Sequence, residues 1–190
     1  ALPIFEFLNP YALMTGFTTL SLFMAHGAIF LLLKTEGRLF AKLTRLLKRG
    51  MIFFMVSFAV TTLYTLIYIP HLSDDFKNNP SLFIIPLLTF LSIANVPRLA
   101  EKRKYKWAFL FSSLTIAFLL VLVAVELYPV LLRSTIDPMY NIDIYNAASS
   151  TKSLHIMMVI VAIGTPLVLF YTIFVYKTFW GKVKLDETSY

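Results

Sequence analysis

The 190-residue chain contains no cysteine, and only 14% of its residues are charged. Without cysteine, disulfides, thiolate nucleophiles and zinc–thiolate sites are excluded, and thiols say nothing about the redox compartment. The sequence also lacks a glycine-rich phosphate loop and a nucleophile with an evident base nearby. No catalytic residue and no metal site is therefore predicted, and the apolar residues become the main source of information.

Five long apolar segments, in a chain that is 58% hydrophobic, predict a membrane protein. A helix needs about 20 apolar residues to cross a ~30 Å hydrocarbon core, and all but the third segment reach that length. We predict an all-α, polytopic helical bundle that forms a single membrane domain over residues 1–190. The expected transmembrane helices cover residues 11–33, 51–69, 81–96, 107–128 and 154–176.

The basic residues predict the topology of the chain in the membrane. All but three of the 17 Lys and Arg residues follow the first, third or fifth apolar segment; the exceptions are Lys77, Arg133 and Lys152. By the positive-inside rule, this distribution places the N-terminus outside and the C-terminus in the cytoplasm. The start at Ala1 lacks the basic stretch of a signal peptide, so residues 1–10 are interpreted as an external lead-in, with an upstream portion absent.

A basic segment at residues 38–49 has amphipathic character. Four leucines share one predicted helix face and four basic residues lie largely on the other (Leu39, Leu43, Leu46 and Leu47; Lys42, Arg45, Lys48 and Arg49). Two interpretations fit equally. The segment is either a helix on the cytoplasmic membrane surface or a cytoplasmic extension of the second transmembrane helix. The basic loops are expected beside anionic membrane lipid, and because no separate basic domain exists, no nucleic-acid partner is expected.

Ionisable residues in or near membrane helices are candidate functional residues, because a charge inside the bilayer is costly. Glu126, His71 and His155 are expected near the external boundary, where they would form a protonatable cluster for proton transfer or subunit contact. A purely interfacial Glu126 is the alternative. His26 lies ~24 Å along its helix from Pro10 and matches neither other histidine in depth, so a bis-histidine haem site is not expected. His26 is also a candidate for proton transfer or subunit contact, but its simpler interpretation is a hydrogen-bonded side chain between helices.

Three stretches of the sequence carry a family resemblance. They are residues 7–16 with His26-Gly27-Ala28 and 34–37; residues 128–132 with Asp137-Pro138; and residues 146–150, 164–172 and 181–183. In order and spacing, these stretches resemble the C-terminal part of subunit II of the cytochrome bd-type quinol oxidases. Family members usually have more membrane helices than the five expected here. The acidic residues assigned to proton uptake in the family lie largely in the absent part, so none is transferred to this chain.

The resemblance implies a respiratory, electron-transport complex of the bacterial inner membrane that oxidises a quinol, reduces dioxygen to water and builds a proton-motive force. In this family haem b, haem d and the quinol-oxidation loop belong to subunit I. The chain is therefore expected to bind no haem and to be non-catalytic by itself. Its implied roles are to pair with subunit I as a heterodimer, to support its assembly and to contribute proton or oxygen routes. A structural quinone within subunit II is also known in the family.

Two other interpretations come from different classes of protein. A small permease or channel-like protein would line its pathway with Glu126, Pro86 and Pro166. A membrane cytochrome would bind haem itself and show Soret absorption when purified. The apolar segments have few of the acid pairs and arginines that ion pathways use, which argues against a solute pump.

Overall fold

The computed structural model describes residues 8–69 and 80–181, so His71 lies outside the described residues. Within them, five helical segments are long and apolar enough to cross a membrane, which confirms the all-α prediction with five spans. The chain divides into two units, one ending at Glu126 and the other covering residues 127–181. The first unit holds four of the five segments.

Helix α1 (Pro10–Lys34) opens the first unit and turns directly into α2 (Gly37–Tyr68). The α1 start is capped by Asn9, whose Oδ1 accepts a hydrogen bond from the Ala12 amide at 2.8 Å, and Pro10 occupies the first helical position. The connection between the two helices is short. Gly37 has a φ of +63°, a conformation that is easy only for glycine, and it lets the chain reverse direction here.

Residues 38–49 are the first part of α2 and continue without a break into its apolar part. This is the helical extension, the second of the two interpretations of the segment. At 1.5 Å per residue the 32-residue helix is about 48 Å long, about 18 Å more than a hydrocarbon core needs. Leu43 and Leu47 are buried, but Leu39 and Leu46 are about half exposed. The buried face of this segment is thus narrower than the predicted four-leucine face, because Leu39 and Leu46 lie at its edge.

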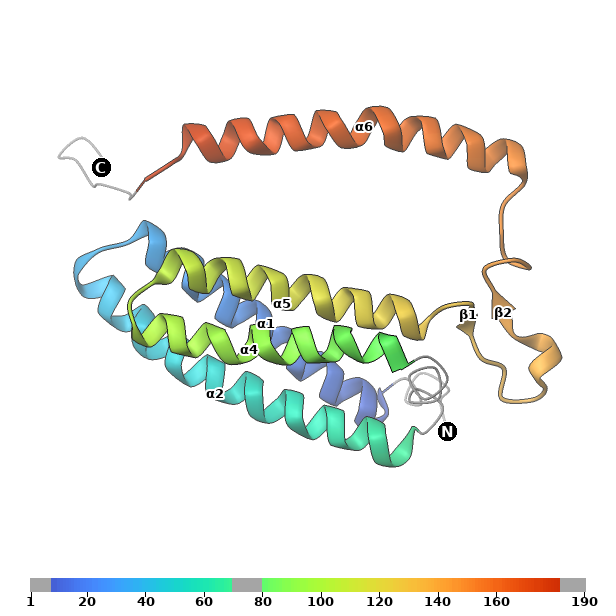
Figure 1. The fold of residues 1–190 in the computed structure, drawn as a ribbon, viewed down its shortest axis with the longest axis horizontal. Coiled ribbons are helices and arrows are strands. Elements are labelled where there is room, and N and C mark those ends of the chain that lie inside the picture. The colour runs from blue at the N-terminus through green and yellow to red at the C-terminus, as the bar shows by residue number, and fades with distance from the viewer. Residues whose placement is uncertain (1–7, 70–79, 182–190) are drawn as a thin grey trace. The chain divides into compact units, whose positions relative to one another are not determined.

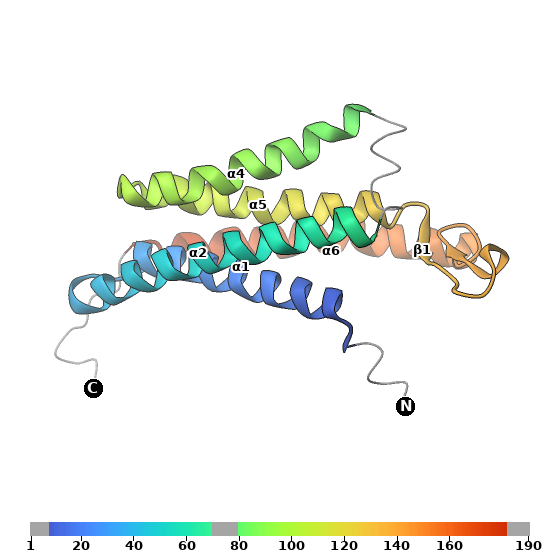
Figure 2. The same cartoon turned by 90° about the horizontal axis from the view of Figure 1, so that it is seen from below.

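Two further helices complete the first unit. A 3₁₀ turn, η3 (Pro80–Phe83), leads into α4 (Ile84–Glu101), and α5 follows (Tyr105–Glu126). Pro86 lies in the first turn of α4, where backbone N–H groups need no intrahelical partner. In both views α1 lies beside α2, and α4 lies beside α5 (Figures 1 and 2). Contacts between α1 and α5 join the two helix pairs.

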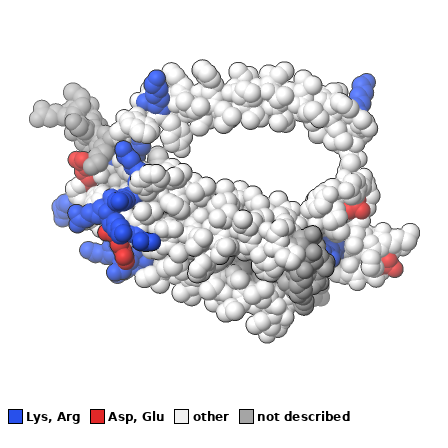
Figure 3. Space-filling view, viewed as in Figure 1, with Lys and Arg blue, Asp and Glu red and all other residues white. Residues whose placement is uncertain are grey.

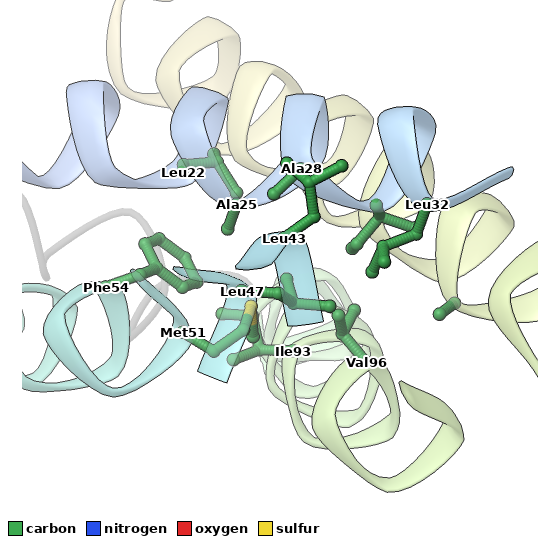
Figure 4. Close-up of a cluster of buried hydrophobic side chains, with 12 residues drawn as sticks. Leu22, Ala25, Ala28, Leu32, Leu43, Leu47, Met51, Phe54, Ile93 and Val96 are labelled. Carbon is green, nitrogen blue, oxygen red and sulfur yellow. The ribbon is translucent and has the colours of Figure 1, made fainter. Parts of the chain in front are cut away.

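The hydrophobic core of this unit lies toward the end where the α1–α2 and α4–α5 turns are found. Its buried side chains come from all four helices, and Figure 4 draws them as sticks between the helices. The members are Leu22, Ala25, Ala28, Ile29, Leu32, Leu43, Leu47, Met51, Phe54, Ile93, Val96 and Ala108. Basic side chains gather at this same end (Figure 3).

Small side chains bring the helices close together. On α5 the buried residues are Ala108, Ser112 and Thr115, spaced by four and three positions along one face. On α1 the buried set includes Ser21, Ala25 and Ala28. Membrane helices gain little from burying apolar surface against each other, because lipid tails are equally apolar. They associate through close packing at small residues and through hydrogen bonds between helices.

The second unit consists of a folded loop and one helix. Strands β1 (Val130–Leu132) and β2 (Ile142–Asp143) pair antiparallel, with the short helix η4 (Pro138–Tyr140) between them. The Ser150 hydroxyl then accepts a hydrogen bond from the Ser153 amide at the start of α6 (Thr151–Thr178). α6 has no buried side chain.

Candidate functional site

His26 is hydrogen-bonded across the interface between α1 and α5. Its Nδ1 lies 2.8 Å from the Ser112 hydroxyl oxygen, 86 positions away in the sequence. The imidazole stacks on the Phe109 ring, with 4.7 Å between ring centroids and 26° between planes. The ring is half-buried, whereas Ser112 is only 4% exposed. This arrangement agrees with the simpler interpretation of His26, in which its side chain is hydrogen-bonded between two helices.

The tautomer of His26 is coupled to the direction in which the Ser112 hydroxyl donates. The Ser112 hydroxyl oxygen lies 2.8 Å from the Phe109 carbonyl oxygen, one turn earlier in α5. A serine hydroxyl has a single hydrogen to donate. When Ser112 donates to this carbonyl, His26 must donate from Nδ1, and its Nε2 is left as an acceptor. When Ser112 donates to Nδ1 instead, the proton of a neutral imidazole sits on Nε2.

An aromatic chain connects His26 to the basic end of the unit. Phe109 lies between His26 and Phe30, and the Phe30 and Phe109 centroids are 5.8 Å apart. The Lys34 ammonium is 5.8 Å from the Phe30 centroid, a cation–π distance. His26, Phe30 and Lys34 follow each other at four-residue intervals on α1, so one helix face presents the whole series. The His26 imidazole on α1 is thus contacted from α5 by both the Phe109 ring and the Ser112 hydroxyl.

Hydroxyl groups form a second polar contact, between α1 and α2. The Thr18 and Thr61 hydroxyls are 3.0 Å apart, and the Thr65 hydroxyl donates to the Tyr11 hydroxyl at 3.2 Å. These residues were not predicted from the sequence, because hydroxyl side chains are common in membrane helices. The available signal was their spacing: Ser57, Thr61 and Thr65 recur every four residues and therefore share one face of α2.

The predicted external cluster of Glu126, His71 and His155 remains a prediction. Glu126 is the last residue of α5 and is half-buried. His155 lies one turn into α6, in the second unit, and its exposed imidazole Nδ1 is 2.8 Å from the Thr151 carbonyl oxygen. His71 lies outside the described residues. Among residues 8–69 and 80–181, no group of three or more His, Asp or Glu side chains is placed to hold a metal ion.

An open groove of about 430 Å³ runs between α1 and α2. Met14 and Phe17 line it from α1, and the α2 side is formed by Phe53, Val56, Ser57, Val60 and Thr61. Its surface is almost entirely apolar, and the Thr61 hydroxyl is already bonded to the Ser57 carbonyl and to Thr18. The groove therefore suits a hydrocarbon chain better than a polar ring.

Comparison with known proteins gives consistent results over almost the whole chain. The family model for cytochrome bd terminal oxidase subunit II matches residues 2–179. The chain is 23% identical to cytochrome bd-I ubiquinol oxidase subunit 2 of Escherichia coli K12, over 96% of this chain and 55% of that protein. It is 25% identical to a probable cytochrome oxidase subunit 2 of Haemophilus influenzae, over 94% of this chain and 54% of that protein. It is 24% identical to cytochrome bd ubiquinol oxidase subunit 2 of Bacillus subtilis, over 96% of this chain and 53% of that protein. The chain spans about half the length of these curated relatives.

Proposed function

The chain belongs to the cytochrome bd terminal oxidase subunit II family, and we propose that it serves as a membrane subunit of a quinol oxidase complex. The observation that carries this proposal is the family match over residues 2–179, which includes all five candidate membrane spans. The same match favours an oxidase subunit over the small permease or channel. The complex would couple quinol oxidation and oxygen reduction to a proton-motive force in the bacterial inner membrane.

In the proposed orientation, the N-terminus lies outside and the C-terminus in the cytoplasm. The α1–α2 and α4–α5 turns then face the cytoplasm, and the basic side chains gathered at that end of the first unit support this placement (Figure 3). Glu126 would lie at the opposite, external end of α5. Membrane lipid would surround the exposed apolar side chains that a partner does not cover.

The proposed partner is the haem-bearing subunit I, with which the chain would form a heterodimer. The described residues of this chain do not themselves fit haem. His26 is hydrogen-bonded to Ser112 and stacked on Phe109, and no second described histidine lies in its unit. Haem b and haem d are proposed to lie in the partner, because the family resemblance implies that subunit I carries them. The apolar α1–α2 groove likewise does not fit the carbonyl-bearing ring of a quinone, so no quinone site is assigned to it.

The proposal is tested by purifying the tagged chain from its native host and recording a reduced-minus-oxidised spectrum. We expect a larger subunit to co-purify and to bring the bands of b- and d-type haem. A matched preparation from a host that lacks the larger subunit should yield a haem-free chain. If the chain from the native host purifies alone and without haem, the proposed function is wrong.

Glu126 tests whether the external end of α5 takes part in proton transfer. If its role is only interfacial, Glu126→Gln should leave the oxidase activity of the assembled complex unchanged, because glutamine keeps the size and polarity of the side chain. The measurement is quinol-dependent oxygen uptake, normalised to haem content. A large loss of activity at normal haem content would instead assign Glu126 a role in proton transfer or gating.

A further inference from the structure

One face of α2 changes from basic to apolar along its length. At about 100° per residue, Arg38, Lys42, Arg45 and Arg49 lie within about 60° of one another; we call these four residues the basic stripe. All four are exposed, and α2 contains no acidic residue. The buried residues of α2 (Leu43, Leu47, Met51 and Phe54) lie on nearly the opposite side of the helix. The basic stripe therefore points directly away from the core.

Beyond Arg49 the same face becomes apolar. Ile52, Val56, Val60 and Leu63 continue it toward the other end of α2, and all four are exposed. The basic stripe covers about 16 Å, close to the ~18 Å by which α2 exceeds the hydrocarbon thickness. In the proposed orientation, the switch between Arg49 and Ile52 would lie at the boundary between headgroups and hydrocarbon, with Arg45 and Arg49 close to the lipid phosphates.

The apolar continuation leads into the groove between α1 and α2. Val56 and Val60 belong both to this face and to the groove lining, together with Phe53 one turn beyond Arg49. The groove is open to its surroundings and has a volume of about 430 Å³. A cationic surface and an apolar groove thus follow one another along a single helix, in the order of the headgroup and acyl chain of a lipid.

We propose that the basic stripe and the α1–α2 groove together bind one anionic phospholipid, with its phosphate against Arg45 and Arg49 and an acyl chain in the groove. Charge complementarity selects an anionic over a zwitterionic lipid, because basic side chains at a membrane surface attract anionic headgroups. The apolar lining would also hold the acyl chain of a lipid, which a free phosphate or an acidic protein segment does not have. The proposal depends on membrane insertion and not on oxidase activity.

Native mass spectrometry of the 190-residue chain, with phosphatidylglycerol or phosphatidylcholine added, tests the headgroup part. The variant R45Q/R49Q is compared with K102Q/K104Q, which removes the same charge from the α4–α5 turn. At about fivefold per basic side chain, we expect about 25-fold weaker phosphatidylglycerol binding in the stripe variant and little change in the control. Equal losses in both variants, or no preference of the unmodified chain for phosphatidylglycerol, would overturn the proposal.

A second pair of variants tests the groove. Val56→Trp fills the groove, whereas Leu63→Trp adds the same side chain to the same face outside the groove lining. We expect only Val56→Trp to weaken phosphatidylglycerol binding several-fold. Equal binding by both variants would refute the acyl-chain site. Retention of added ubiquinone in preference to phosphatidylglycerol would refute the choice of ligand.

Discussion

The hydrogen bond between His26 and Ser112 offers a direct test of how α1 and α5 are held together. Ser112→Ala removes the hydroxyl but keeps a small side chain at a position that is only 4% exposed. His26→Phe removes the nitrogen but keeps an aromatic ring that can still stack on Phe109. The two variants therefore remove the same hydrogen bond from opposite sides and leave the packing largely in place.

The expected magnitude follows from the membrane setting of this contact. Hydrogen bonds between membrane helices contribute ~0.6 kcal/mol on average and up to ~1.7 kcal/mol. At 2.8 Å the His26–Ser112 contact has favourable geometry, so Ser112→Ala should destabilise the fold by about 1 kcal/mol. The loss of unfolding free energy in the double variant should be smaller than the sum of the losses in the two single variants, by about 0.6–1.7 kcal/mol.

Ser113→Ala is the matched control. The Ser113 hydroxyl donates to the same Phe109 carbonyl at 3.0 Å, but the His26 contact belongs to Ser112. Because both serines lose a backbone hydrogen bond and gain the helix propensity of alanine, their difference isolates the contact between helices. The assay is reversible unfolding of the chain by steric trapping in bicelles. A coupling energy below ~0.3–0.5 kcal/mol, the range in which independent sites add, would refute the argument.

Three further predictions concern other contacts. Thr61→Val keeps the side-chain shape but removes the hydroxyl pair between α1 and α2, and it should cost up to ~1.7 kcal/mol in the same unfolding assay. Ala108→Leu should lower the free energy of unfolding by about 1–3 kcal/mol, because Ala108 is fully buried. Ala117→Leu, at an exposed position of α5, is the control and should change the free energy of unfolding by less than ~0.5 kcal/mol. Equal effects of the two substitutions would contradict the packing of α5. Hydrogen bonding to the Tyr128 hydroxyl, with a smaller effect of the Asp143 carboxylate, raises the pKa of Tyr145. Tyr145 should therefore keep its proton to higher pH than an ordinary tyrosine, and Tyr128→Phe should lower this pKa in an NMR titration of ring-labelled tyrosine.

The sequence predicted five apolar helices, and some of the helices extend beyond the predicted membrane spans. The third span was predicted to stop at residue 96, yet α4 continues through Pro97 to Glu101. The second span was predicted from residue 51, and α2 starts earlier, at Gly37, as the interpretation of residues 38–49 as a helical extension allows. Both differences have one cause. Hydropathy reports where the lipid ends, whereas a helix continues as long as its backbone hydrogen bonds are satisfied.

The candidate site shows a similar division. His26 was identifiable because an ionisable side chain within an apolar segment is rare. Ser112 and Phe109 were not identifiable as its partners, since serine and phenylalanine are ordinary residues of membrane helices. Ser112 lies 86 positions from His26, and no local pattern encodes a pairing at that separation. The external cluster of Glu126, His71 and His155 depends on distances of the same kind and stays a prediction.

The sequence by itself determined that this chain is a membrane protein with five helical spans, because the length and polarity of a segment decide whether it can cross a bilayer. It also identified the family through short stretches distributed along the chain. Only the tertiary structure decided which helices meet, which serine binds His26, and that the basic stripe of α2 leads into an apolar groove. Such features depend on how helices rotate and pack against one another. In a membrane this packing is set by small residues and individual hydrogen bonds, because the apolar surfaces gain little from choosing each other over lipid.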